Sequence, residues 1–286
     1  MLYALPLCVS LLLTLQKVSQ KRYSTICSSG TLLFSGMISL CAMLVFVAVV
    51  SVERAWALSP RLLIPAVGFG LSYAAATVFT VLAIQNGSLA RTTLVTSYSL
   101  LVPALAGLCI LREPLKGTML AGILLLILAL WLTNHRRSNG GVTLKWVVFV
   151  ALGFAGSGLC STVQKLAPHY IAEAKAHQNM YMIAALGLSS AVLITASFLM
   201  KETDRKTTLR RGAPLALICG LCNGGVNILV LHLNARIPAS VMFPIISAGQ
   251  IILVCLYSLV FCHEKFTKKQ WAGFAVGILS AVLLNL

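Results

Sequence analysis

The chain repeats a short motif, reading Thr-Leu-Gln-Lys-Val at residues 14–18 and Thr-Val-Gln-Lys-Leu at residues 162–166. A second motif recurs in the same order, as Glu-Pro-Leu-Lys-Gly-Thr-Met-Leu-Ala-Gly at 113–122 and Glu-Lys-Phe-Thr-Lys-Lys-Gln-Trp-Ala-Gly at 264–273. The two offsets are 148 and 151 residues, and a three-residue loop insertion between the motifs reconciles them. Because both order and spacing are kept, the sequence predicts two homologous halves.

The composition determines the fold class. The chain has 286 residues, of which 59% are hydrophobic and 10% charged, and its mean hydropathy is +0.94. Soluble domains carry about 25% charged residues, so this chain could not cover a water-facing surface. A membrane span needs about 20 apolar residues, and ten segments meet or approach that length: 2–20, 28–51, 62–84, 90–111, 117–133, 146–167, 180–200, 213–233, 238–262 and 270–285.

Each half then holds five predicted spans. Because five is odd, the second half must enter the membrane from the side opposite to the first. Inverted repeats of this kind are typical of secondary transporters, with the solute site near the midplane where the halves meet. The predicted fold is therefore an all-α, polytopic membrane protein of about ten transmembrane helices, arranged as two inverted five-helix repeats.

The second motif has the form Glu-x-[Leu/Phe]-x-x-x-x-x-Ala-Gly in both copies. Together with the spans and the two five-helix halves, it resembles the EamA family of the drug/metabolite transporter superfamily over essentially the whole chain. The resemblance implies one EamA-like repeat in residues 1–134 and a second in residues 145–286. It also implies a carrier, in a family whose substrates include amino acids, nucleotide sugars and other metabolites.

The charged residues narrow the expected solute. All six acidic residues fall in breaks between spans, whereas proton relays and cation sites usually use ionisable groups inside the membrane. We therefore expect a transporter that moves a small neutral or zwitterionic metabolite across the cell (cytoplasmic) membrane by alternating access. The alternatives are an exporter of anionic metabolites or drugs, and a channel-like permeation protein.

Uncharged polar residues near the middle of the spans are the candidate substrate-binding groups. The 151-residue offset pairs Ser72 with Asn223 and Ser99 with Gln250. Asn223 and Asn227 are four residues apart and share one helix face, while Tyr73 and Tyr98 could stack on a solute or hydrogen-bond to it. The other interpretation of such residues is hydrogen bonding between helices, which is common in membrane bundles. The predicted substrate-binding set is Ser72, Tyr73, Tyr98, Asn223, Asn227 and Gln250.

Gln16, Lys17, Gln164 and Lys165 form the repeated pairs. We expect each lysine in the last turn of the first helix of its half, with Pro168 ending the second of these helices. The two lysines would then lie near opposite membrane faces, acting in gating or in admitting the solute. Alternatively, each serves the helix dipole or reaches the interface.

Glu113 and Glu264 precede the fifth and tenth spans, where a carboxylate complements a helix N-terminus. Proton coupling is the alternative role for these two residues.

Other classes of function find no support in the residues. No nucleotide-binding motif is present, and an enzyme would need convergent acid, base or nucleophile groups within the spans. We expect no catalytic residues, no metal and no cofactor. The formal charge of +16 comes from basic residues in the breaks between spans. That position favours a role in anchoring the helices in the membrane over a role in binding nucleic acid. The expected partners are a small-molecule solute and the lipid bilayer, and a homodimer is one allowed assembly.

The basic residues also bear on orientation. The loops after odd-numbered spans, with the adjoining helix ends, carry 15 Lys and Arg residues, against 7 for the even-numbered spans. The positive-inside rule then places the odd loops in the cytoplasm and both termini outside. The family resemblance implies the reverse arrangement, with both termini inside.

Overall fold

The computed structural model is all-α in the residues that it describes: 4–27, 29–54, 56, 59–100, 102–103, 106, 110, 117–133, 143–234, 239–264 and 266–283. The helices are α1 Ala4–Ile26, α2 Thr31–Glu53, α3 Leu63–Asn86, α4 Leu89–Ser97, α6 Gly117–Thr133, α7 Leu144–Tyr170, α8 Ala172–Ala176, α9 Gln178–Leu199, α10 Arg205–Thr207, α11 Ala213–Asn234, α12 Ala239–Val260 and α13 Lys268–Leu283. Short turns adjoin three of them: η1 Pro60–Leu62 before α3, η2 Tyr98–Leu100 after α4, and the π-helical turn η3 Thr208–Gly212 before α11.

Long apolar helices make this a multi-pass membrane protein. Among the described residues, five segments are long and apolar enough to cross a bilayer: Thr31–Glu53, Pro60–Asn86, Leu144–Pro168, Gln178–Leu199 and Arg205–Val230. Shorter apolar stretches lie in α6 and α12. The fourth predicted span, 90–111, is described as the shorter helix α4 followed by η2.

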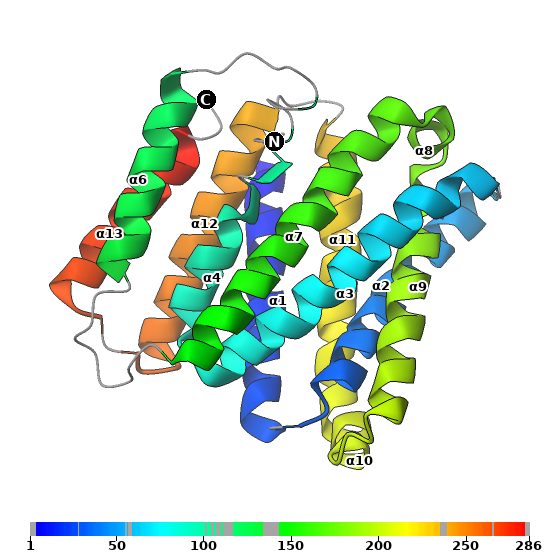
Figure 1. Cartoon of the computed structure of the whole chain (residues 1–286), viewed down its shortest axis with the longest axis horizontal. Helices are drawn as coiled ribbons and strands as arrows, with labels where there is room; N and C mark the ends of the chain where they lie inside the picture. The colour runs from blue at the N-terminus through cyan, green and yellow to red at the C-terminus, as the bar shows by residue number, and fades with distance from the viewer. Residues whose placement is uncertain are drawn as a thin grey trace.

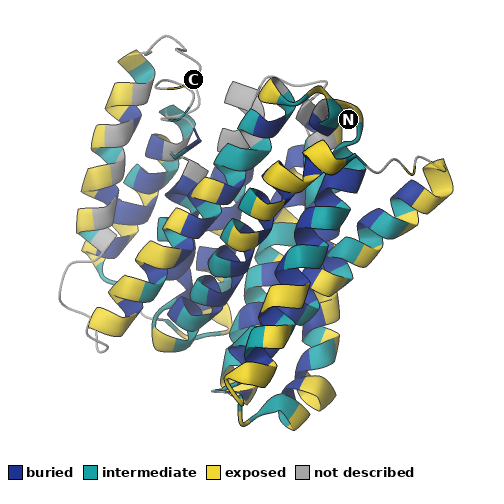
Figure 2. Ribbon diagram, turned by 45° about the vertical axis from the view of Figure 1, so that its right-hand side comes forward, coloured by how far each residue is buried: buried dark blue, intermediate teal, exposed yellow. Residues whose placement is uncertain are grey.

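The outer surface is itself apolar. Large hydrophobic side chains such as Leu124, Trp131 and Leu152 are exposed on α6 and α7. Figure 2 shows exposed residues along the outer sides of the helices and buried residues between them. Lipid tails are as apolar as leucine, so this surface suits a bilayer, whereas in water it would form one of the large apolar patches that soluble monomers avoid.

The helices pack in matched pairs. The central helix α3 packs against α7 and α9, and α11 packs in a similar way against α1 and α2. At one end of the molecule α2 packs against α9, and at the other end α6 packs against α13 (Figure 1). Helix α1 lies in the middle and also contacts α12.

Glycines allow the closest of these helix crossings. A Cβ on Gly156 of α7 would lie 2.7 Å from the backbone nitrogen of Ala76 in α3, and one on Gly220 of α11 would lie 2.9 Å from the carbonyl oxygen of Ile38 in α2. Gly30 joins α1 to α2 with a φ of 98°, in the left-handed region that glycine tolerates. In membranes, such close backbone approach is what holds helices together.

The first helix of each half is longer than the sequence predicts. Helix α1 continues to Ile26, so Lys17 lies in its middle, and the expectation that it sits in the last turn is wrong. Helix α7 runs through Pro168 to Tyr170, so Pro168 does not end it. Lys165 therefore also lies before the last turn, and its side chain is outside the described residues.

Candidate functional site

The two asparagines on α11 form a local hydrogen-bonded unit. Nδ2 of Asn227 donates to the carbonyl oxygen of Asn223 at 2.8 Å and to its Oδ1 at 3.1 Å. Asn223 is buried and Asn227 is half-buried. The expectation that they share one helix face is confirmed, and the side-chain oxygen of Asn223 already accepts a hydrogen bond from its neighbour.

Gln250 links the two halves on the other side of α1. It is buried in α12, and its Oε1 accepts a hydrogen bond of 3.4 Å from the Ser97 hydroxyl of α4. Ser99 follows in η2, where its carbonyl oxygen is 3.2 Å from the position of a Cβ on Gly158 of α7. Ser72 takes a similar place on α3, because its carbonyl oxygen lies 3.1 Å from such a position on Gly156.

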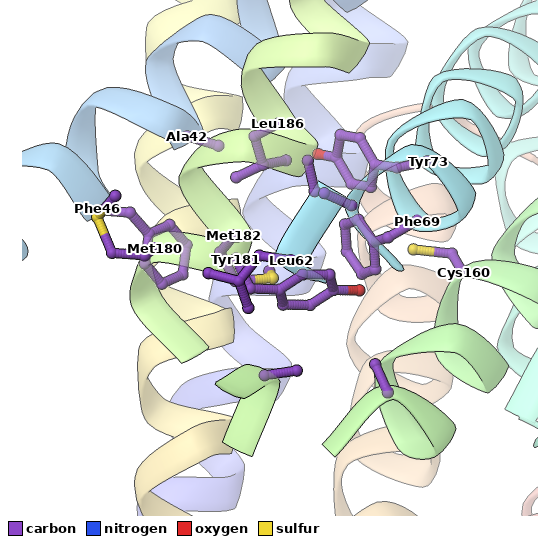
Figure 3. Packing of buried hydrophobic residues seen from close by; sticks show 14 of the residues in the cluster. Ala42, Phe46, Leu62, Phe69, Tyr73, Cys160, Met180, Tyr181, Met182 and Leu186 are labelled. Carbon is purple, nitrogen blue, oxygen red and sulfur yellow. The ribbon is translucent and has the colours of Figure 1, made fainter. Parts of the chain in front are cut away.

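Tyr73 and Tyr98 belong to different side-chain clusters. Tyr73 packs with residues of α3, α9 and α7, whereas Tyr98 packs with residues of α4, α12 and α13. The Phe69 ring lies between Tyr73 and Tyr181, with centroids 5.9 Å and 5.8 Å away (Figure 3). Tyr181 was not among the predicted site residues, and only the packing of α9 on α3 places its ring beside Phe69.

The repeated Gln-Lys pair of α1 faces α11. Gln16 is buried, and its carbonyl oxygen accepts a hydrogen bond of 3.5 Å from the Cys219 thiol. Lys17 is half-buried beside it, and Gln164 is half-buried in α7. Thr14 and Thr162, which open the two copies of this motif, each donate to the carbonyl four residues earlier at 2.8 Å. The two copies thus share their local structure as well as their sequence.

Glu202 binds the N-terminus of a helix from the other half of the chain. Its carboxylate accepts from the backbone N–H groups of Leu32 at 2.8 Å and Leu33 at 3.1 Å, and from the Ser197 hydroxyl at 2.6 Å. The first N–H groups of a helix have no partner within it, and a negative charge there is favoured by the dipole. Glu202 was not among the predicted site residues, and its only signal in the sequence is its position after the seventh predicted span.

Glu264 makes the same kind of contact to α4. Its carboxylate accepts from the Leu89 N–H at 3.0 Å and from the Ser88 hydroxyl at 2.6 Å. A carboxylate at a helix N-terminus was expected, but on the helix that Glu264 precedes; the structure places it on α4 instead. Glu113 lies outside the described residues. The Arg91 guanidinium lies 5.7 Å from the centre of the Trp146 ring, which adds a cation–π contact nearby.

The connections that carry these two carboxylates, from α9 to α10 and from α12 to α13, lie on one face of the molecule, the lower face in Figure 1. We use "lower face" for the described residues of the connections from α1 to α2, α3 to α4, α9 to α11 and α12 to α13. Further contacts join the halves here, because the Tyr23 hydroxyl is 3.0 Å from the Thr208 hydroxyl and the Ser29 hydroxyl is 3.0 Å from that of Thr203. Several polar contacts therefore join the two halves at the lower face.

The opposite, upper face carries exposed contacts. Nδ2 of Asn179 donates to Glu53 at 3.1 Å, and Arg61 pairs with Glu173 at 2.8 Å while its side chain is 78% exposed. The backbone N–H of Glu173, followed by the Arg61 guanidinium, holds the pKa of the Glu173 carboxyl below its ordinary value. Exposed pairs of this kind contribute little to stability.

No group of three or more His, Cys, Asp or Glu side chains in the described part of the chain could hold a metal ion. The cysteines described there are free thiols, including Cys219 and Cys222. Buried thiols of this kind behave as small hydrophobic groups.

Comparison with known proteins gives a family and a fold. Residues 144–286 match the family described as the EamA-like transporter family. The chain matches 24 chains of solved structures. One of them is a crystal structure with 14% sequence identity to this chain and a TM-score of 0.67. The match spans 98% of this chain and 94% of the other. At that identity the likeness concerns the fold alone. No curated protein sequence matches the chain.

Proposed function

This chain belongs to the EamA-like transporter family, and on that premise we propose that it is a secondary carrier moving a small neutral or zwitterionic metabolite across the cell membrane by alternating access. The family match is the observation that carries the proposal. Its expected partners are the solute and the surrounding lipid.

We further propose that residues 1–134 and 145–286 are inverted five-helix repeats. The contacts of Gly36 and Gly187 support this. A Cβ on Gly36 would meet Ile194, one on Gly187 would meet the Met43 sulfur at 3.2 Å, and both pairs are related by the same 151-residue offset. The hydroxyls of Ser39 and Ser189 meet at 3.0 Å between them. Reciprocal contacts are what a two-fold relation between α2 and α9 would produce.

In this carrier the solute would bind around α1, near Asn223 and Gln250. Both side chains are buried and come from the second half, and the oxygen of each already accepts a hydrogen bond, from Asn227 in one case and Ser97 in the other. A buried amide is costly to keep in an apolar bundle unless its N–H groups are hydrogen-bonded, and a polar solute would supply an acceptor for them. Ser72, Tyr73, Tyr98 and Asn227 complete the proposed binding set.

The lower face is then the closed gate of this conformation. Glu202 and Glu264 each come from the second half and hold the N-termini of α2 and α4 in the first. Opening this face would break both contacts, whereas the exposed pairs on the upper face could separate at little cost in free energy.

The lower face carries the excess of Lys and Arg residues, so we place it in the cytoplasm and both termini outside. A fluorescent protein fused to the C-terminus should therefore be dark in cells, while a fused periplasmic reporter enzyme should be active. If the fluorescent fusion is bright and the reporter enzyme is inactive, the orientation is the opposite of the one proposed, and the carrier proposal is unaffected.

Saturable counterflow in proteoliposomes tests the carrier itself. We expect Asn223→Ala and Gln250→Ala each to lower counterflow about tenfold, as the loss of one solute hydrogen bond implies. Asn86→Ala is the matched control, because Asn86 is exposed and donates only to Leu82 of its own helix. Flux that rises linearly without saturation would instead indicate a channel, and unchanged counterflow in both variants would assign the two amides to packing.

A further inference from the structure

The connection from α9 to α11 concentrates positive charge at the lower face. It includes α10 and η3 and lies at the bottom of Figure 1. It carries five basic residues and two acids, namely Lys201, Arg205, Lys206, Arg210 and Arg211 with Glu202 and Asp204. The Glu202 carboxylate is already bound to the N-terminus of α2. The basic residues of this connection therefore outnumber the acids that could pair with them.

The turn η3 is fixed against the protein on one side only. It contacts α1, α2 and α11. Thr208 is fully buried with its hydroxyl 3.0 Å from that of Tyr23, and a Cβ on Gly212 would lie 3.0 Å from the Tyr23 ring. The three residues between them are exposed: Leu209, Arg210 and Arg211. The packing of Thr208 and Gly212 thus holds two neighbouring arginines on the outer side of an anchored turn.

These two arginines differ from Arg205, which is engaged within the protein. Its Nε donates to the carbonyl oxygen of Glu202 at 3.0 Å, and its guanidinium lies 4.9 Å from the centre of the Phe198 ring. For Arg210 and Arg211, the described residues provide neither an ion pair nor a cation–π contact. A guanidinium offers a planar fork of donors that matches the oxygens of a phosphate group. The pair is therefore available to an external anion.

An apolar stripe on α11 continues from the arginines. Starting at Arg211, exposed side chains recur at steps of three, four and three residues, as Pro214, Ile218 and Leu221. Residues three and four apart are neighbours on one side of a helix. Ile218 and Leu221 are 37% and 51% exposed, and the seven residues from Pro214 to Leu221 span about 10 Å along the helix. A phosphate bound by the arginines would thus lie at the end of a strip of surface that suits an acyl chain.

We propose that Arg210 and Arg211 bind the phosphate of an anionic membrane phospholipid, with an acyl chain of that lipid along Pro214, Ile218 and Leu221. Basic clusters next to a membrane-spanning helix are attracted to anionic lipids, and hydrogen bonds from guanidinium to phosphate are charge-assisted. A choline headgroup would instead bring a second positive charge to the arginines. The site lies outside the bundle and does not depend on the proposed carrier function.

Titration of the purified protein with lipid in a neutral detergent tests the site. The probes are phosphatidylglycerol and phosphatidylcholine with the same acyl chains, and the apparent Kd comes from the shift in melting temperature. We expect phosphatidylglycerol to stabilise the wild type and phosphatidylcholine to have little effect. The double variant Arg210→Gln/Arg211→Gln should weaken the Kd for phosphatidylglycerol about tenfold or more, because each basic residue near an anionic surface contributes about fivefold. Lysine at both positions should keep part of the affinity, since it retains the charge and loses the fork.

A charge-matched variant and a soluble probe are the controls. Arg54→Gln/Arg61→Gln removes two positive charges from the upper face and should leave the Kd unchanged. Glycerophosphate carries the phosphate without an acyl chain and should not stabilise the protein. A wild type that does not distinguish the two lipids overturns the proposal, as does an equal loss of affinity in the two double variants. Stabilisation by glycerophosphate at the same concentrations would assign the arginines to a soluble phosphate and also overturn it.

Discussion

Glu202→Ala is expected to lower the free energy of unfolding by about 3 kcal/mol, because it removes the acceptor for three donors at once. The N–H groups of Leu32 and Leu33 and the Ser197 hydroxyl all bind this carboxylate. Helix α2 begins at Thr31, and its N-cap residue, Gly30, has no side chain to cap it, so no local group can replace Glu202. Equilibrium unfolding of the protein in mixed micelles measures the change.

The matched control for this variant is Glu173→Ala on the upper face. Its partner Arg61 is exposed, and removal of an exposed ion pair has little effect on the free energy of unfolding. Glu202→Gln should fall between the two, since it keeps one acceptor oxygen and loses the charge. Equal stabilities of Glu202→Ala and Glu173→Ala would show that the lower-face contact does not hold α2 in place.

Gly156→Ala is expected to lower the free energy of unfolding by about 1–3 kcal/mol through overpacking. The added Cβ would lie 2.7 Å from the nitrogen and 3.0 Å from the Cα of Ala76, and 3.1 Å from the carbonyl oxygen of Ser72. All three atoms belong to the backbone of α3, which cannot turn aside as a side chain would. Helix α7 must therefore move away from α3, and thermal unfolding should occur at a lower temperature.

Gly68→Ala provides the control on the same helix pair. There the added Cβ would meet only the Val163 side chain, at an ordinary contact distance of 3.5 Å. Alanine also favours a helix over glycine by about 1 kcal/mol, so this variant should be neutral or slightly more stable. A Gly156→Ala variant that melts with the wild type would mean that the α3–α7 crossing is looser than the structure shows.

The family and the helical fold could be read from short-range features. Apolar runs marked where most helices lie, and the Glu-x-[Leu/Phe]-x-x-x-x-x-Ala-Gly motif led to the EamA family, which the match over residues 144–286 confirms. The four-residue spacing of Asn223 and Asn227 correctly predicted their shared face. These features depend on neighbouring residues along one helix, where spacing alone sets geometry.

The position of Lys17 within its helix was misjudged for a physical reason. The stretch after residue 17 reads Val-Ser-Gln-Lys-Arg-Tyr, and its polarity suggested the end of a membrane span. The structure continues α1 through it, with Ser19, Gln20 and Tyr23 buried against other parts of the protein. A run of polar residues indicates that a segment does not face lipid. It does not indicate that the helix ends there, because polar side chains can be buried between neighbouring helices.

The sequence by itself was thus sufficient to infer that this is a membrane protein of apolar helices, to which family it belongs and that its motifs are repeated. Composition and local spacing are enough to establish those properties. Only the tertiary structure decided that Glu202 and Glu264 hold α2 and α4, that Tyr181 joins Phe69 and Tyr73, and that α1 continues past Lys17 to Ile26. Each of these features depends on how helices distant in the chain pack against one another. The spacing of residues within one segment does not specify that packing.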